Sequence, residues 1–227
     1  GEFGHVVTPI NNLKKVTQDG YRNGFQVCTH AIGDKANREV LNIYKNTFEN
    51  NLTDHRFRIE HAQHIDLEDI PRFNELGIIA AVQGIHMSSD RPWAINRLGE
   101  QRIIDSAYPW KKLLQSSAIL VNGTDAPVEP LNPIASFYAS VSRKTLNKTP
   151  VGGYEPEERM SREEALRSYT INGAYASFEE NNKGSIEKGK LADFTILSHD
   201  IMSIPEDSIL NTKIKMTIIG GKIVYSN

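Results

Sequence analysis

A repeated order of short apolar strand, loop and helix constrains the fold of this chain more than any other feature. The strands are predicted at residues 25–29, 56–60, 78–83 and 119–122. Each is followed by a loop and, further on, by a helical pattern, which is typical of βα units built around a parallel sheet. Residues 78–83 form an almost unbroken apolar run, as expected for a parallel strand buried on both faces. The chain is therefore predicted to be an α/β protein.

Residues 34–49 give the clearest helical pattern. Their apolar side chains recur at a spacing that places them on one face of a helix: Ala36, Val40, Ile43, Tyr44 and Phe48. Other helices are predicted at residues 8–22, 67–76, 110–115, from Pro133, and 161–171. The last begins with a capping box of Ser161 and Glu164. The segment from Gly84 to Gln101 reads as a long loop.

The end of the chain has a different pattern. Short β segments are separated by glycine turns, and Gly220-Gly221 predicts a hairpin. We therefore expect two parts, an α/β part over residues 1–180 and a small β segment over residues 181–227.

Composition excludes several classes of protein. The chain has 26 basic and 28 acidic residues and a formal net charge of −2, with no block of like charge, which argues against nucleic-acid and membrane-surface partners. Its apolar runs are too short to cross a bilayer. One cysteine, Cys28, excludes an intrachain disulfide. We expect a cytoplasmic protein, although a signal peptide could lie in an N-terminal region that this sequence lacks.

Three side chains with metal-binding chemistry stand at predicted strand ends. His30 and His61 are 31 residues apart, about one βα unit, and Asp125 follows after a further 64, about two units. Because the carboxyl ends of parallel strands face the site in α/β folds, we expect these side chains to converge. Two imidazoles and a carboxylate suit a divalent metal, Zn first, with Fe, Mn or Co as alternatives. Hydrogen-bonded structural histidines and an aspartate in a turn remain the ordinary alternative.

Three further residues are candidates for contact with substrate. Asp34 follows the first strand, Gln83 is the last residue of the third, and His86 comes three residues later. Each also has a simpler interpretation, because Asp34 suits a helix cap and His86 suits a solvated loop. The sequence has no G-x-S-x-G nucleophile elbow and no phosphate-binding loop.

Several motifs together resemble the amidohydrolase superfamily, and within it amidohydrolase family 3, which includes N-substituted formamide deformylase-like enzymes. These motifs are "THAIGDKA", "RIEHAQHI", "VQGIHMSSDRPWA", "NGTDAPVEPLNP" and "KGSIEKGKLADFTIL". The resemblance implies a (β/α)8 barrel of TIM type with a small β-sandwich built from both chain ends. It also implies that His30 and His61 bind metal from the fifth and sixth barrel strands. Asp125 would bind metal from the eighth strand and act as general base and acid.

The chain also departs from the family pattern. It has no His-x-His pair and no recognisable counterpart of the bridging lysine, and it holds about four βα units. Gly84 stands where this branch often has proline. We therefore expect the C-terminal portion of a longer enzyme, the second half of a barrel plus C-terminal strands of the β-sandwich. An open half-barrel exposes strand edges, so it should form a homo-oligomer or need the missing N-terminal half.

The sequence thus predicts a metal-dependent hydrolase of C–N bonds in a small-molecule amide or formamide-like substrate. As a fragment, the chain should be weakly active or inactive. A hydrolase that uses one metal held by His30, His61 and Asp125 alone is a second possibility. A non-catalytic, self-associating α/β module with structural histidines is the alternative from another class.

Overall fold

The computed structural model describes residues 5–48 and 53–227, and these form two compact units. The first unit takes in the described part of residues 1–82 together with residues 98–120, and the second residues 83–97 and 121–227. The boundary expected near residue 180 stays a prediction.

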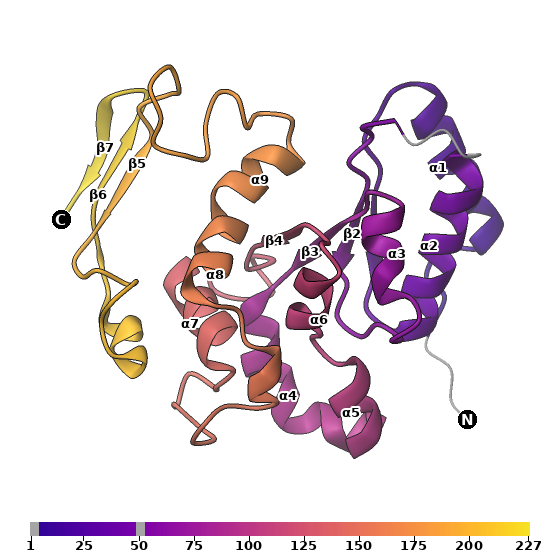
Figure 1. The fold of residues 1–227 in the computed structure, drawn as a ribbon, viewed down its shortest axis with the longest axis horizontal. Coiled ribbons are helices and arrows are strands. Elements are labelled where there is room, and N and C mark those ends of the chain that lie inside the picture. Colours follow the sequence, from indigo (N-terminus) through magenta and orange to yellow (C-terminus); the bar gives the residue numbers. More distant parts are fainter. Residues whose placement is uncertain (1–4, 49–52) are drawn as a thin grey trace. The chain divides into compact units, whose positions relative to one another are not determined.

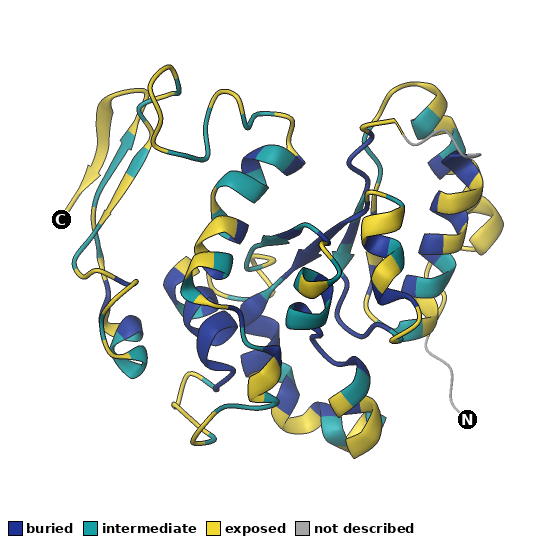
Figure 2. Ribbon diagram, in the orientation of Figure 1, coloured by how far each residue is buried: buried dark blue, intermediate teal, exposed yellow. Residues whose placement is uncertain are grey.

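The main sheet has four strands in chain order, β1 (Cys28–Ala31), β2 (Arg58–His61), β3 (Ile79–Val82) and β4 (Leu120–Asn122). β2 pairs in parallel with both β1 and β3. All four positions of β3 are buried, and this strand is dark blue in Figure 2, which confirms the prediction of a strand covered on both faces. The parallel sheet confirms the α/β class and is consistent with part of a barrel.

Several helices belong to the described part of the first unit. They are α1 (Ile10–Arg22), α2 (Asp34–Phe48), α3 (Ile70–Glu75), α5 (Glu100–Ser106) and α6 (Trp110–Gln115). α1 and α2 lie side by side in Figure 1. Aromatic rings fill the space beneath α2, where Phe57 meets the rings of Tyr44 and Phe48 at centroid distances of 5.1 and 5.3 Å. Burial of such rings is a large apolar contribution to stability.

One position on α2 differs from the predicted helix face. Val40, Ile43, Tyr44 and Phe48 are buried as expected, but Ala36 is exposed and Asn37 is fully buried in its place. The helix as described ends at Phe48, and position 49 of the predicted range lies outside the described residues.

The second unit contains most of α4 (Gly84–Leu98), with α7 (Pro133–Ser142), α8 (Arg162–Tyr169) and α9 (Ile171–Ala176). A 3-10 turn at Pro156–Glu158 lies between α7 and α8, and a second at Glu206–Asn211 lies within the tail. The tail is an antiparallel sheet of β5 (Phe194–Leu197), β6 (Ile214–Ile219) and β7 (Lys222–Ser226). The hairpin predicted at Gly220-Gly221 joins β6 to β7, so that prediction is confirmed.

Two other expectations about helices had opposite outcomes. The capping box is confirmed, because Ser161 and Glu164 exchange both expected hydrogen bonds. The long loop predicted from Gly84 to Gln101 is wrong, since α4 occupies most of it. Pro92 and the polar residues before it suggested a loop, but burial of Ile85, Met87 and Ala94 stabilises a helix that contains the proline.

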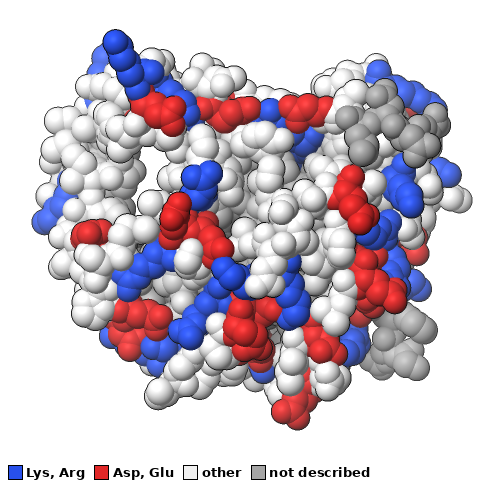
Figure 3. Space-filling view, in the orientation of Figure 1, with Lys and Arg blue, Asp and Glu red and all other residues white. Residues whose placement is uncertain are grey.

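The described residues carry no large surface of a single charge on the face shown in Figure 3, where acidic and basic side chains alternate. In this same part of the chain, none of the helices combines the length and apolar character needed to cross a bilayer.

Candidate metal-binding and catalytic site

The ends of β1 and β2 bring two histidine rings together. His30 lies within β1, His61 is the last residue of β2, and their ring centroids are 4.5 Å apart at an interplanar angle of 74°. The strand register places Ala31 opposite His61, so His30 is one residue from the pairing position. His30 and His61 are thus 31 residues apart in the sequence, yet their rings are in direct contact, as the βα spacing predicted.

An unusual backbone conformation makes this contact possible. In a regular strand His61 would share the side of Ile59, which is buried, whereas His30 is on the exposed side of β1. His61 instead has a φ of 75° and Ala62 a φ of 44°, both in the left-handed region. Such conformations cost about 1–3 kcal/mol each for residues with a Cβ. The positive φ turns the imidazole of His61 out of the strand alternation and toward His30.

Hydrogen bonds hold the residues that follow this strained pair. The N–H of His64 donates to the carbonyl oxygen of Ile32 at 2.9 Å, which ties the turn after β2 to the turn after β1. Tyr108 N–H donates to the Gln63 carbonyl at 2.7 Å, and Ile65 N–H donates to the Ser106 carbonyl at 2.9 Å. These three backbone hydrogen bonds hold residues 63–65, which directly follow the strained pair.

Electrostatic pairs surround the start of α2. Partial burial disfavours the charged form of Asp34, but hydrogen bonds from Lys35 N–H and the Arg102 guanidinium lower its pKa overall. Asp34 is thus an ionised partner of Arg102, at 2.7 Å. Its proposed contact with substrate stays a prediction. Burial lowers the pKa of His64 to about 4, so this ring is neutral at pH 7.

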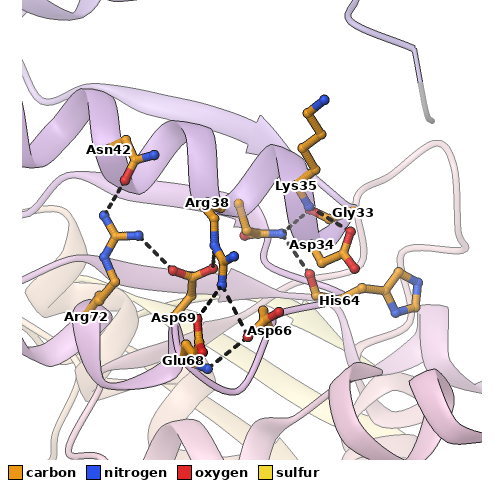
Figure 4. Close-up of polar contacts among 11 residues, drawn as sticks. Gly33, Asp34, Lys35, Arg38, Asn42, His64, Asp66, Glu68, Asp69 and Arg72 are labelled. Carbon is orange, nitrogen blue, oxygen red and sulfur yellow. Dashed lines mark hydrogen bonds and ion pairs between the residues drawn. The ribbon is translucent and has the colours of Figure 1, made fainter.

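A second cluster joins α2 to the segment before α3. Arg38 donates to the carboxylate of Asp69 at 2.7 Å and lies within ion-pair distance of Asp66 and Glu68. Asp69, which is buried, also accepts from Arg72 at 2.7 Å (Figure 4). Because the two arginines neutralise one buried carboxylate, the cluster secures the β2–α3 connection against α2.

Asp125 lies in the second unit, three residues after β4, with a φ of 56°. The start of its loop is held by polar contacts, since Ser136 Oγ donates to the Gly123 carbonyl at 3.2 Å. Asn122 donates to Ser140 Oγ at 3.0 Å and accepts from the Tyr169 hydroxyl at 3.0 Å. The convergence of Asp125 with the two histidines stays a prediction.

Gln83 and His86 flank the beginning of α4, also in the second unit. His86 is buried in the helix rather than solvated in a loop, and its N–H donates to the Gln83 carbonyl at 3.2 Å. Their contact with substrate stays a prediction. A cavity of about 520 Å³ in the second unit is lined by other residues, among them Asn132, Thr212 and Tyr225.

The donor chemistry at the end of β1 and β2 fits a divalent metal. Neutral imidazole nitrogens bind Zn at about 2.0–2.1 Å, and two rings in direct contact can share one ion. Throughout residues 5–48 and 53–227, no group of three or more His, Cys, Asp or Glu side chains is arranged as a metal cage. The histidine pair is therefore the part of the predicted site that the structure assembles.

Two asparagines in these networks were missed by the sequence analysis. Asn37 and Asn122 are neutral and carry no metal-binding or catalytic motif. The available signal was a polar residue at helical spacing with Val40, Leu41 and Tyr44, which places Asn37 on the apolar face of α2.

The fold and the site together define an α/β protein with a pair of histidines, a candidate metal site, at the ends of parallel strands. Comparison with known proteins gives the particular family: the sequence profile of the amidohydrolase family, Amidohydro_3, matches residues 7–225. The chain belongs to this family.

Individual relatives agree with this assignment. The chain is 36% identical to Protein LONG AFTER FAR-RED 3 of Arabidopsis thaliana, over 98% of this chain and 38% of that protein. It is also 36% identical to the putative amidohydrolase YtcJ of Bacillus subtilis, over 98% of this chain and 41% of the relative. N-substituted formamide deformylase of Arthrobacter pascens is 28% identical, over 89% of this chain and 37% of the enzyme.

Solved structures give the same result. An uncharacterized metal-dependent hydrolase from Pyrococcus horikoshii superposes with a TM-score of 0.78 at 30% identity, over 91% of this chain and 40% of that one. The chain thus spans about two fifths of the length of these relatives.

Proposed function

We propose that this chain contributes part of the active site of a metal-dependent hydrolase that cleaves C–N bonds in amide or formamide-like small molecules. The observation that carries the proposal is the direct contact of the His30 and His61 rings at adjacent strand ends. Membership of the amidohydrolase family and similarity to a formamide deformylase support the choice of bond.

His30, His61 and Asp125 would hold the ion, and zinc suits this mixture of imidazole and carboxylate. A divalent metal at such a site lowers the pKa of a coordinated water and polarises a carbonyl oxygen. Each of the two imidazoles would offer one ring nitrogen to the ion. The Asp125 carboxylate accepts the proton of the attacking water and passes it to the departing nitrogen.

The proposal includes weak metal binding and low turnover by the chain alone. The sequence contains no His-x-His pair, so His30, His61 and Asp125 offer fewer donors than the family pattern provides. We also propose that oligomerisation or an additional chain segment completes the site.

A metal titration of purified variants tests the assignment. We expect His30→Ala and His61→Ala each to weaken Co²⁺ binding by about tenfold or more, because each removes a direct donor. Asp125→Ala should weaken binding and also abolish any hydrolysis of simple N-formyl amines. Binding is followed by the visible absorption of bound Co²⁺ and checked by metal analysis after preparation without chelators.

His199→Ala is the matched control, because His199 is exposed and bonds to the adjacent Ser198. This variant should bind Co²⁺ like the wild type. Equal binding by all four variants and the wild type would show that the assigned residues do not hold the metal, and would favour the non-catalytic α/β module.

A further inference from the structure

A single buried amide joins the two turns that carry the candidate metal-binding histidines. Asn37 is 0% exposed, and its Nδ2 lies within hydrogen-bond distance of four carbonyl oxygens. Three belong to the end of β1 and the turn after it, those of Ala31, Ile32 and Gly33, at 3.2, 3.3 and 3.0 Å. The fourth belongs to His64 in the turn after β2, at 3.1 Å.

The identity of the side-chain atom facing these carbonyls follows from their chemistry. A carbonyl oxygen only accepts hydrogen bonds, so four of them require a donor, and the amide NH2 supplies two hydrogens that they share. The opposite atom, Oδ1 of Asn37, is buried with no hydrogen-bond partner. An unsatisfied buried acceptor is costly. The amide nitrogen therefore donates to both turns, while the amide oxygen is left without a hydrogen bond.

The positions of the acceptors relate this amide to the histidines. The Ala31 carbonyl follows His30 directly, and the His64 carbonyl lies two residues beyond Ala62, which is one of the two left-handed residues. The amide and the backbone hydrogen bond from His64 N–H to the Ile32 carbonyl thus both join the chain just after the strained segment to the turn after β1. Figure 4 shows Gly33 and His64, which supply two of the four carbonyl oxygens, near the start of α2.

We infer that Asn37 is a positioning residue that maintains the positive φ of His61 and so sets the contact between the His30 and His61 rings. The inference rests on the proposed function, and it names a residue outside the predicted ligand set. Without the amide, the turn after β2 loses its side-chain tie to the turn after β1. The segment at His61 and Ala62 can then relax toward ordinary dihedrals, which returns the His61 ring to the buried side of β2.

The test compares Asn37→Ala and Asn37→Asp with Asn42→Asp in the 227-residue chain. Asn37→Asp keeps the shape but places a carboxylate against four carbonyl oxygens, whereas Asn42 is an exposed residue of the same helix whose Oδ1 accepts from Arg72. Two readouts are taken well below each variant's unfolding temperature. One is the Co²⁺ dissociation constant with its visible spectrum, and the other is the nuclear Overhauser contact between the His30 and His61 rings in metal-free protein.

We expect both Asn37 variants to raise the dissociation constant about 10–100-fold, the usual effect of losing a residue that orients metal ligands, and to lose the ring contact. Asn42→Asp should match the wild type in both. If Asn37→Ala lowers only the unfolding temperature and keeps the ring contact and Co²⁺ spectrum, Asn37 is merely structural and the inference fails.

The ring measurement separates this failure from failure of the proposed function. If the wild type and His61→Ala bind Co²⁺ equally, the metal assignment is wrong. The positioning role of Asn37 then stands if its variants lose the ring contact in metal-free protein, and falls if they keep it.

Discussion

A buried neutral histidine beside the candidate site gives the chain a specific acid sensitivity. His64 is 8% exposed, and its Nδ1 has no hydrogen-bond partner. Burial lowers its pKa from 6.5 to about 4, with Asp34 opposing this effect and Arg102 adding to it. In the unfolded chain the ring takes up a proton near pH 6.5, while in the folded chain it stays neutral until about pH 4. The stability that this residue contributes is therefore complete above pH 6.5 and is lost as pH falls toward 4.

We predict that this loss amounts to about 3 kcal/mol, at about 1.4 kcal/mol for each pH unit between the two pKa values. His64→Asn removes the titrating group, so its stability should fall less steeply over the same range. Urea unfolding at pH 7, 5.5 and 4.5 in the presence of a chelator measures the difference without any contribution from metal. Parallel pH profiles for the wild type and the variant would contradict the prediction.

At the scale of residues, the sequence revealed donors by their chemistry but not the backbone that orients them. His30 and His61 could be found because imidazoles at strand ends are unusual and their spacing matched a βα unit. The positive φ of His61 could not be found, since neither histidine nor alanine marks a left-handed position as glycine does. The prediction that Ala36, and not Asn37, lies on the buried face of α2 failed for a similar reason. A search for apolar residues at helical spacing does not detect a buried amide.

At the scale of elements, the packing of α4 on α7 explains why position 84 is glycine. The N–H of Gly84 donates to Asn122 Oδ1 at 3.0 Å. A Cβ at this position would lie 2.1 Å from Ser140 Oγ and 2.6 Å from the Ser136 carbonyl oxygen. The proline that this branch of the family often has here could not donate to Asn122, so the chain combines a glycine with an asparagine acceptor.

We predict that Gly84→Ala destabilises the chain by about 1–3 kcal/mol, because the neighbouring serine and backbone must shift to admit the methyl group. Gly84→Pro should cost more, since it also leaves Asn122 without this donor. Urea unfolding measures both changes. Gly173→Ala is the control, because a Cβ there meets nothing within 4 Å and alanine favours helix α9.

If Gly84→Ala unfolds at the same urea concentration as the wild type, the contact between α4 and α7 is looser than these distances indicate.

The same region shows the limit of element prediction from sequence. Glycine, serines, an aspartate and Pro92 outweighed the buried residues of α4 in the pattern, so a helix was predicted as a loop. Strand β3, with an unbroken apolar run, left no such conflict.

At the scale of the whole molecule, exposed strand edges should govern how the chain behaves in solution. β7 is an outer strand of its sheet and is exposed along its whole length, as its yellow colour in Figure 2 shows. Val224 at its centre is 58% exposed. A long apolar edge strand offers unpaired backbone groups to another chain, and a lysine on such an edge opposes pairing.

We therefore predict that the wild type self-associates as its concentration rises and that Val224→Lys shifts it toward the monomer. Val151→Lys adds the same charge at a 98% exposed valine in a loop and should leave association unchanged. Light scattering coupled to size-exclusion chromatography measures the mass of each. Association that both lysines reduce equally would reflect net charge alone, because only Val224→Lys alters a strand edge. A wild type that stays monomeric at every concentration would show that β7 is not used for pairing between copies of this chain.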